Sequence, residues 1–106
     1  MVTVITKENV KAEVEDYSGA LVIDIAAAWC GPCQQMKPIF EQVARDLGPA
    51  YKFIEINVDE SRDLAVKYRV TSVPTFVFVK AGEIKGQERG FMSFEDLKAK
   101  VKSYLG

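Results

Sequence analysis

Histidine is absent from this 106-residue chain, and cysteine occurs only twice, as Cys30 and Cys33. Histidine is the side chain that titrates near neutral pH without perturbation, so proton transfer here must use a shifted carboxylate, a shifted lysine or water. Structural zinc sites take four ligands, mostly cysteine and histidine. Carboxylates or a second chain would have to complete such a site in this protein, and we therefore predict that no metal is bound.

The chain also lacks an excess of charge of either sign. Its 14 basic and 15 acidic residues leave a net charge of -1, and no basic cluster suggests a nucleic-acid partner. The amino terminus lacks the basic start and apolar core of a secretory signal, and no apolar run reaches the length of a membrane span. We expect a cytoplasmic protein with no membrane partner. The length and the 48% hydrophobic content suit a single domain over residues 1–106.

Both cysteines lie in the stretch Trp29-Cys30-Gly31-Pro32-Cys33. Pro32 has a preset φ that suits the first position of a helix, and this spacing then puts the two cysteine Cα atoms roughly 5 Å apart, as a disulfide requires. The positive end of the helix dipole favours a thiolate at Cys30, which predicts that Cys30 attacks and Cys33 resolves. A structural disulfide is the alternative. However, so short a loop gains little stability from a disulfide, and a reducing cytosol opposes it.

The pattern of apolar residues predicts five strands and four helices in the order βαβαβαββα. The strands are expected at residues 2–6, 20–25, 52–58, 75–80 and 83–89, and the second helix at residues 32–47. The first helix has a stripe of Val10, Val14 and Tyr17, the third follows a cap at Asp59 or Ser61, and the last begins at a capping box of Ser93 and Asp96. Helical crossovers imply parallel pairing and the final hairpin implies antiparallel pairing. The fold class is therefore α/β, with a mixed five-stranded sheet flanked by helices.

Asp24 interrupts the apolar strand at residues 20–25. Burial of a carboxylate in a strand covered on both faces raises its pKa, which would let Asp24 carry protons near neutral pH. Resolution by Cys33 needs a base, and Asp24 is the best candidate, acting directly or through water. The alternative is an aspartate at a strand end that simply faces solvent.

These residues together resemble the thioredoxin family over essentially the whole chain. The resemblance rests on the Trp29 to Cys33 motif after a strand that carries Asp24, on Val73-Pro74-Thr75, and on Gly90 before the final helix. It implies the thioredoxin fold and a general protein-disulfide reductase without an organic cofactor. The implied partners are disulfide-containing protein substrates and a thioredoxin reductase that draws on NADPH. With no third thiol for an intermolecular disulfide, we expect a monomer.

The resemblance also assigns roles around the cysteines. It implies a cis Pro74 beside them, with the backbone of Val73 pairing with an extended substrate segment. It further implies that Trp29 is a surface indole and that Gly90 leaves space for the docked peptide. A trans proline, a core tryptophan and an ordinary turn glycine are the alternatives from sequence alone.

Three positions depart from the family pattern. Ala26 stands where an aromatic residue is usual, so packing under the cysteines must differ. Glu55 and Gln34 stand where lysines are common. A carboxylate at Glu55 would raise the pKa of Asp24 or share its proton, and we predict that the two carboxyls titrate as a coupled pair.

Two other functions remain open from the sequence. An oxidase or isomerase would use the same cysteines at a different reduction potential. A binding module could use the fold as a scaffold with incidental thiols.

Overall fold

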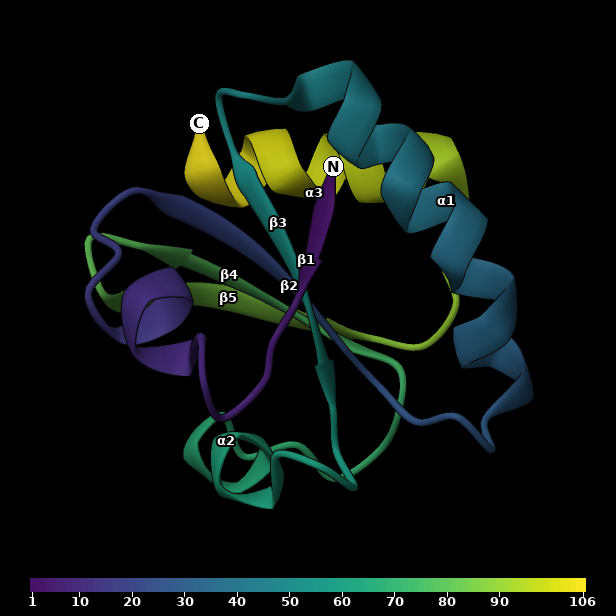
Figure 1. Ribbon diagram of the computed structural model, residues 1–106. Coiled ribbons are helices and arrows are strands. Elements are labelled where there is room, and N and C mark those ends of the chain that lie inside the picture. The colour runs from purple at the N-terminus through teal and green to yellow at the C-terminus, as the bar shows by residue number, and fades with distance from the viewer.

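The computed structural model describes all 106 residues and contains one mixed five-stranded sheet (Figure 1). The strands are β1 (Val2–Val4), β2 (Ala20–Ala26), β3 (Lys52–Asn57), β4 (Thr75–Lys80) and β5 (Glu83–Arg89). Their order across the sheet is β1-β3-β2-β4-β5, with parallel pairing among β1, β3 and β2. β4 and β5 add in antiparallel fashion. The predicted fold class is confirmed.

Four helical segments flank the sheet: η1 (Lys11–Glu15), α1 (Gly31–Leu47), α2 (Arg62–Lys67) and α3 (Phe94–Leu105). α1 and α3 cover one face, and η1 and α2 cover the other (Figure 1). The alternation of side chains along a strand decides which residues face each layer. In β2, Val22 packs in the core under α1 and α3, whereas Ile23 and Ile25 pack in the opposite core. Asp24, two residues after Val22, therefore faces the α1 layer.

The largest departure from the predicted boundaries lies near the amino terminus. β1 ends at Val4 rather than at residue 6 because the Asn9 side chain bonds the backbone that follows. Asn9 Nδ2 donates to the Val4 carbonyl at 2.9 Å, and Asn9 Oδ1 accepts from the Thr6 N–H at 2.7 Å. The helix predicted next is a single π-helical turn, although its apolar stripe packs against the core as expected.

The two predicted helix caps differ in outcome. Ser93 Oγ accepts a hydrogen bond from the Asp96 N–H at 3.1 Å, as the capping box predicts. Ser61 is the N-cap residue of α2, one of the two predicted positions, but its side chain makes no capping hydrogen bond. Asp59, the other predicted position, bonds Trp29 through its carboxylate instead.

Aromatic side chains fill the core between the sheet and the α1 and α3 layer. The ring of Phe40 lies 5.4 Å from that of Phe53 and 6.1 Å from that of Phe76, measured between centroids. The ring of Tyr104 stacks on Phe78 at 4.8 Å and lies directly against Gly86, where an added Cβ would overlap it. The missing side chain at Gly86 thus lets α3 close onto β5.

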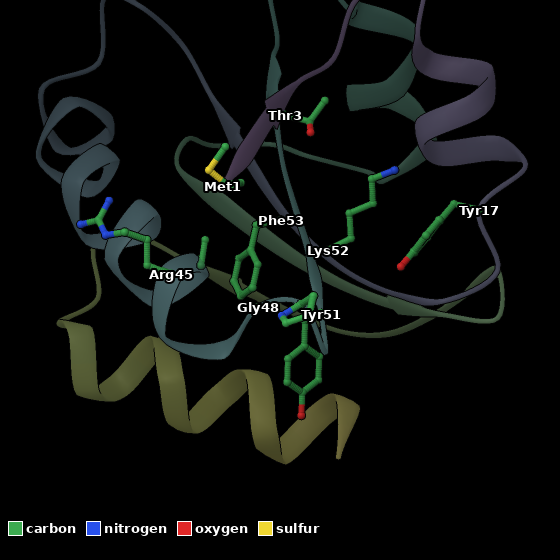
Figure 2. Close-up of a pocket in the computed structure, with 10 residues that line it drawn as sticks. Met1, Thr3, Tyr17, Arg45, Gly48, Tyr51, Lys52 and Phe53 are labelled. Carbon is green, nitrogen blue, oxygen red and sulfur yellow. The ribbon is translucent and has the colours of Figure 1, made fainter.

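The fold brings four chain segments together at one end of the sheet, where strands begin or end. β2 and β3 end there, β4 begins there and β5 ends there. The predicted site residues follow or precede these strand ends. A cavity of about 590 Å³ is lined by residues that include Arg45, Tyr51 and Lys52. Figure 2 shows these side chains. The cavity lies at the start of β3, at the opposite end of the sheet, and none of the predicted site residues lines it.

None of the helices combines the length and the apolar character that crossing a bilayer requires.

Candidate active site

Cys30 and Cys33 form a disulfide at the amino terminus of α1, with their Cα atoms 5.2 Å apart. The helix begins at Gly31, so Pro32 is its second residue rather than its first. Cys30 is the N-cap residue, and its Sγ accepts a hydrogen bond from the Cys33 N–H at 3.2 Å. The free N–H groups and the dipole of the helix favour negative charge at this position. When the disulfide is reduced, they stabilise a thiolate on Cys30.

The two sulfurs differ in accessibility. Cys30 is 6% exposed and Cys33 is 1% exposed, while Gly31 and Pro32 between them are exposed. A reagent or substrate therefore approaches Cys30 first.

Trp29 is a surface residue, with 71% of its area exposed. Its Nε1–H donates a hydrogen bond to Asp59 Oδ2 at 3.0 Å, which ties the cysteine loop to the segment after β3. The structure thus agrees with the surface indole that the family resemblance implied.

The segment before β4 lies against the cysteines. The Val73–Pro74 bond is cis, and the Val73 carbonyl oxygen lies 3.7 Å from Cys30 Sγ. Val73 makes no backbone hydrogen bond within the chain, so its N–H and C=O are free to pair with another segment. Thr75 is buried, and its hydroxyl donates to the Ser72 carbonyl at 2.6 Å.

Gly90 joins this group from the end of β5. Its N–H donates to the Pro74 carbonyl at 2.9 Å, and its φ of 88° lies in the region that favours glycine. The structure therefore brings together residues from positions 30, 73–75 and 90.

Asp24 is 1% exposed and lies beneath α1 on the central strand. Burial is the largest cause that raises its pKa to about 7, and the charge of Glu55 adds to the rise, while the charge of Lys37 opposes it. Its Oδ1 has no hydrogen-bond partner in the protein. Because nothing in the chain bonds this oxygen, the charged form of Asp24 is poorly stabilised.

Glu55 is the direct neighbour of Asp24 in the parallel pairing of β2 and β3. Its carboxylate is mostly buried and lies 3.7 Å from the ammonium group of Lys37 on α1. Gln34, where the family commonly has a lysine, points elsewhere: its Nε2 donates to the Ala28 carbonyl at 3.1 Å. The positive charge near the buried carboxyls therefore comes from Lys37.

Two small cavities meet at the ion pair of Lys37 and Glu55. One, of about 200 Å³, contacts Asp24, and the other, of about 60 Å³, contacts Cys33. Ala26 lines the smaller cavity, so its short side chain leaves room beside Cys33. That room exceeds the roughly 30 Å³ that a water molecule occupies in the liquid.

Sequence reasoning missed three contributors to the site. Lys37 lies four residues after Cys33 and so on the same face of α1, a spacing that could have revealed it. The bond between Trp29 and Asp59 joins two loops distant in sequence, and no local pattern marks it. The third is a hydrogen bond of 3.3 Å from the Met92 N–H to Met36 Sδ, which ties the segment after Gly90 to α1.

The structure holds no cluster of three or more side chains suited to bind a metal ion. The disulfide itself is the redox group that the chain provides.

Comparison with known proteins gives a consistent result. The family model described as Thioredoxin matches residues 1–103. The thioredoxin of Bacillus subtilis is 35% identical over 100 residues, which cover 94% of each chain. The thioredoxin of Chlorobaculum thiosulfatiphilum is 32% identical over 101 residues, or 95% of this chain and 94% of that protein. Thioredoxin H4 of Arabidopsis thaliana is 40% identical over 86 residues, or 81% of this chain and 71% of that protein.

Proposed function

The chain belongs to the thioredoxin family of thiol–disulfide oxidoreductases, and we propose that Cys30, Cys33 and Asp24 divide the reduction of protein disulfides between them. The observation that carries this proposal is the cysteine pair at the start of α1, with Cys30 as the N-cap and a buried carboxyl on the strand below.

Cys30 carries out the first step. Its thiolate attacks one sulfur of a substrate disulfide, a bond forms between that sulfur and Cys30 Sγ, and the second substrate sulfur leaves as a thiolate that takes up a proton. Two features support this role: the greater exposure of Cys30 and the hydrogen bond that its Sγ accepts from the Cys33 N–H.

Cys33 and Asp24 carry out the second step. The Asp24 carboxylate accepts the proton of the Cys33 thiol, directly or through a water molecule, and the Cys33 thiolate attacks Cys30 Sγ. The bond between Cys30 and the substrate breaks, and the substrate sulfur that was bonded to Cys30 leaves as a thiolate that takes up a proton. Two electrons pass to the substrate and the disulfide of Cys30 and Cys33 remains. A pKa of about 7 suits Asp24 for this task at neutral pH.

Glu55 and Lys37 adjust the base. The charge of Glu55 raises the pKa of Asp24 and that of Lys37 lowers it, and both residues line the cavities that contact Asp24 and Cys33. We propose that Glu55 acts on Asp24 through its negative charge, which favours the protonated form of Asp24.

The segment Val73-Pro74-Thr75 receives the substrate. An extended peptide can pair with the free N–H and C=O of Val73 in the manner of an added strand. Gly90, which has no side chain, leaves open space beside this segment, as no atom lies within 4 Å of a Cβ placed there.

The wider setting is also part of the proposal. A thioredoxin reductase, with NADPH upstream, would regenerate the dithiol. A pair that cycles between dithiol and disulfide suits the reducing cytoplasm. We propose a single domain over residues 1–106 that works as a monomer.

Single-turnover reduction of a peptide disulfide tests the division of roles. We expect C30S to be inert and C33S to stop at a mixed disulfide with the substrate, detectable by mass spectrometry. D24N should form the mixed disulfide at the wild-type rate but resolve it about 100-fold more slowly at pH 7, because it lacks the base. D63N, which changes an exposed aspartate, is the control. Equal rates of resolution in D24N and the wild type would remove Asp24 from the mechanism.

The pH profile of resolution tests the coupling to Glu55. E55K should move the midpoint of that profile to lower pH, because a positive charge replaces a negative one beside Asp24. E55Q, which only removes the negative charge, should give a smaller movement in the same direction. An unchanged midpoint in both variants would show that Glu55 does not act on Asp24.

A further inference from the structure

The charges around the cysteines differ in sign between the two sides. At the end of the sheet that holds the cysteines, four segments lie side by side in this order: the end of β3, the end of β2 with the cysteines, the start of β4 and the end of β5. Asp59 and Glu60 lie in the turn after β3, separated from the strand by Val58, and Arg89 is the last residue of β5. The end of β3, on the Trp29 side of the cysteines, is thus acidic, and the end of β5, on the Pro74 side, carries a positive charge.

Arg69 lies on the same side as Arg89. The Gln87 side chain donates a hydrogen bond to the Tyr68 carbonyl at 2.6 Å, which holds the turn after α2 against β5. Arg89 follows Gln87 by two residues, so both side chains project from the same face of the strand. Arg69 comes directly after Tyr68 in the turn. We refer to Arg69 and Arg89 as the basic pair.

Neither member of the basic pair has a partner in the protein. Both are exposed, and neither forms an ion pair or a side-chain hydrogen bond. Burial raises the pKa of Tyr68 and the nearby charge of Glu15 adds to the rise, but Glu15 forms no ion pair with either arginine. The two guanidinium groups are therefore available to an anionic ligand.

The end of α2 holds Arg69 in a fixed position. Tyr68 is the C-cap of that helix, and Arg69 follows it with a φ of 56°, a left-handed conformation that commonly ends helices. The Arg69 N–H donates to the Val66 carbonyl at 3.0 Å, and the Val70 N–H donates to the Ala65 carbonyl at 2.9 Å. The turn that carries Arg69 is therefore well defined and, through the bond from Gln87 to Tyr68, lies against β5.

We infer that the basic pair selects substrates in which an acidic segment flanks the disulfide. A peptide strand that pairs with Val73 extends toward the end of β5 on one side, where carboxylates would meet Arg69 and Arg89. On its other side, the same peptide runs toward Asp59 and Glu60, which repel carboxylates. The inference rests on the proposed function and adds a substrate class to it.

Reduction of designed peptides by pre-reduced protein tests this inference. The peptides share one disulfide and carry three glutamates, three glutamines or three lysines on either the amino-terminal or the carboxyl-terminal flank. At low ionic strength we expect the second-order rate constant for the glutamate peptide to be about tenfold that for the lysine peptide, and only when the charges lie on one of the two flanks. Added salt should reduce this ratio.

Variants of the basic pair provide the decisive comparison. In the double variant R69G/R89Q, the rate constants for the glutamate and lysine peptides should become nearly equal. The rate constant for the glutamine peptide should stay nearly unchanged. The control R45Q/K102Q removes the same net charge at two exposed, unpaired positions away from the cysteine end of the sheet. It should retain the wild-type ratio of the glutamate and lysine rate constants. Equal rates for all peptides with the wild type, or an undiminished ratio in R69G/R89Q, would overturn the inference alone. Failure to reduce even the glutamine peptide would overturn the proposed function and this inference with it.

Discussion

Replacing Asp24 with asparagine should stabilise the folded protein at neutral and alkaline pH. The pKa of Asp24 is about 7 in the folded protein and 3.8 for the ordinary side chain, so the folded state binds the proton more tightly than the unfolded chain. Below pH 3.8 the carboxyl is neutral in both states and imposes no penalty. As the pH rises from there to about 7, the unfolded chain ionises first and the folded protein loses stability. Above about 7 the penalty is constant.

The size of the penalty follows from the two pKa values. The difference between 3.8 and about 7 amounts to about 4 kcal/mol, at about 1.4 kcal/mol per pH unit. Because Asp24 is almost fully buried, solvent screening removes little of this energy. Asparagine has nearly the same shape and no charge, so D24N should avoid the penalty at every pH.

Urea unfolding of the oxidised protein from pH 4 to pH 9 measures this effect. The free energy of unfolding of D24N relative to the wild type should rise with pH and level off above pH 7, with a total change on the order of 4 kcal/mol. Any constant contribution from burying the amide cancels, because only the change with pH is compared. D63N should follow the wild type at all pH values above the range in which exposed aspartates titrate. A difference between D24N and the wild type that does not vary with pH would refute the reasoning.

Three further predictions concern packing, backbone conformation and charge. G86A should destabilise the protein by about 1 to 3 kcal/mol in urea unfolding, because its Cβ would overlap the Tyr104 ring. R69G should stabilise it by about 1 kcal/mol by relieving the positive φ, whereas R69A, which keeps that conformation strained, should give no gain. E55Q should lower the pKa of Asp24, measured from the pH dependence of its carboxyl carbon signal in NMR, and an unchanged pKa would contradict the assignment of Glu55 as a cause.

Regular features of the fold were accessible from the sequence. The bounds of β4 and β5 agree with the prediction residue for residue, because a continuous run of Phe and Val marks β4, and the Ala81-Gly82 turn and Gly90 bound β5. Val22 and Ile25 identify β2 as buried on both faces, which also fixes the burial of Asp24. The register that places Glu55 beside Asp24 follows from the family resemblance rather than from any local pattern.

The remaining features depend on contacts between segments distant in the chain. The early end of β1 results from side-chain bonds of Asn9, which compete with the sheet and leave no periodic trace. Lys37 reaches Glu55 across the space between α1 and β3, and only the packed structure decides that this lysine, rather than one at position 34, supplies the charge. Helical spacing alone places Lys37 on the right face but does not name its partner.

The edges of the sheet bear on how the protein stays in solution. A molecule with unpaired backbone groups at Val73 is exposed to unwanted pairing with other copies of itself. β1 is only three residues long, and β5 has Glu83, Lys85 and Arg89 along its exposed edge, with an irregular register where it pairs with Val79. Short edges, charges and irregular pairing each oppose edge-to-edge aggregation. We expect the protein to remain unaggregated at concentrations where a sheet with long, apolar edges would precipitate.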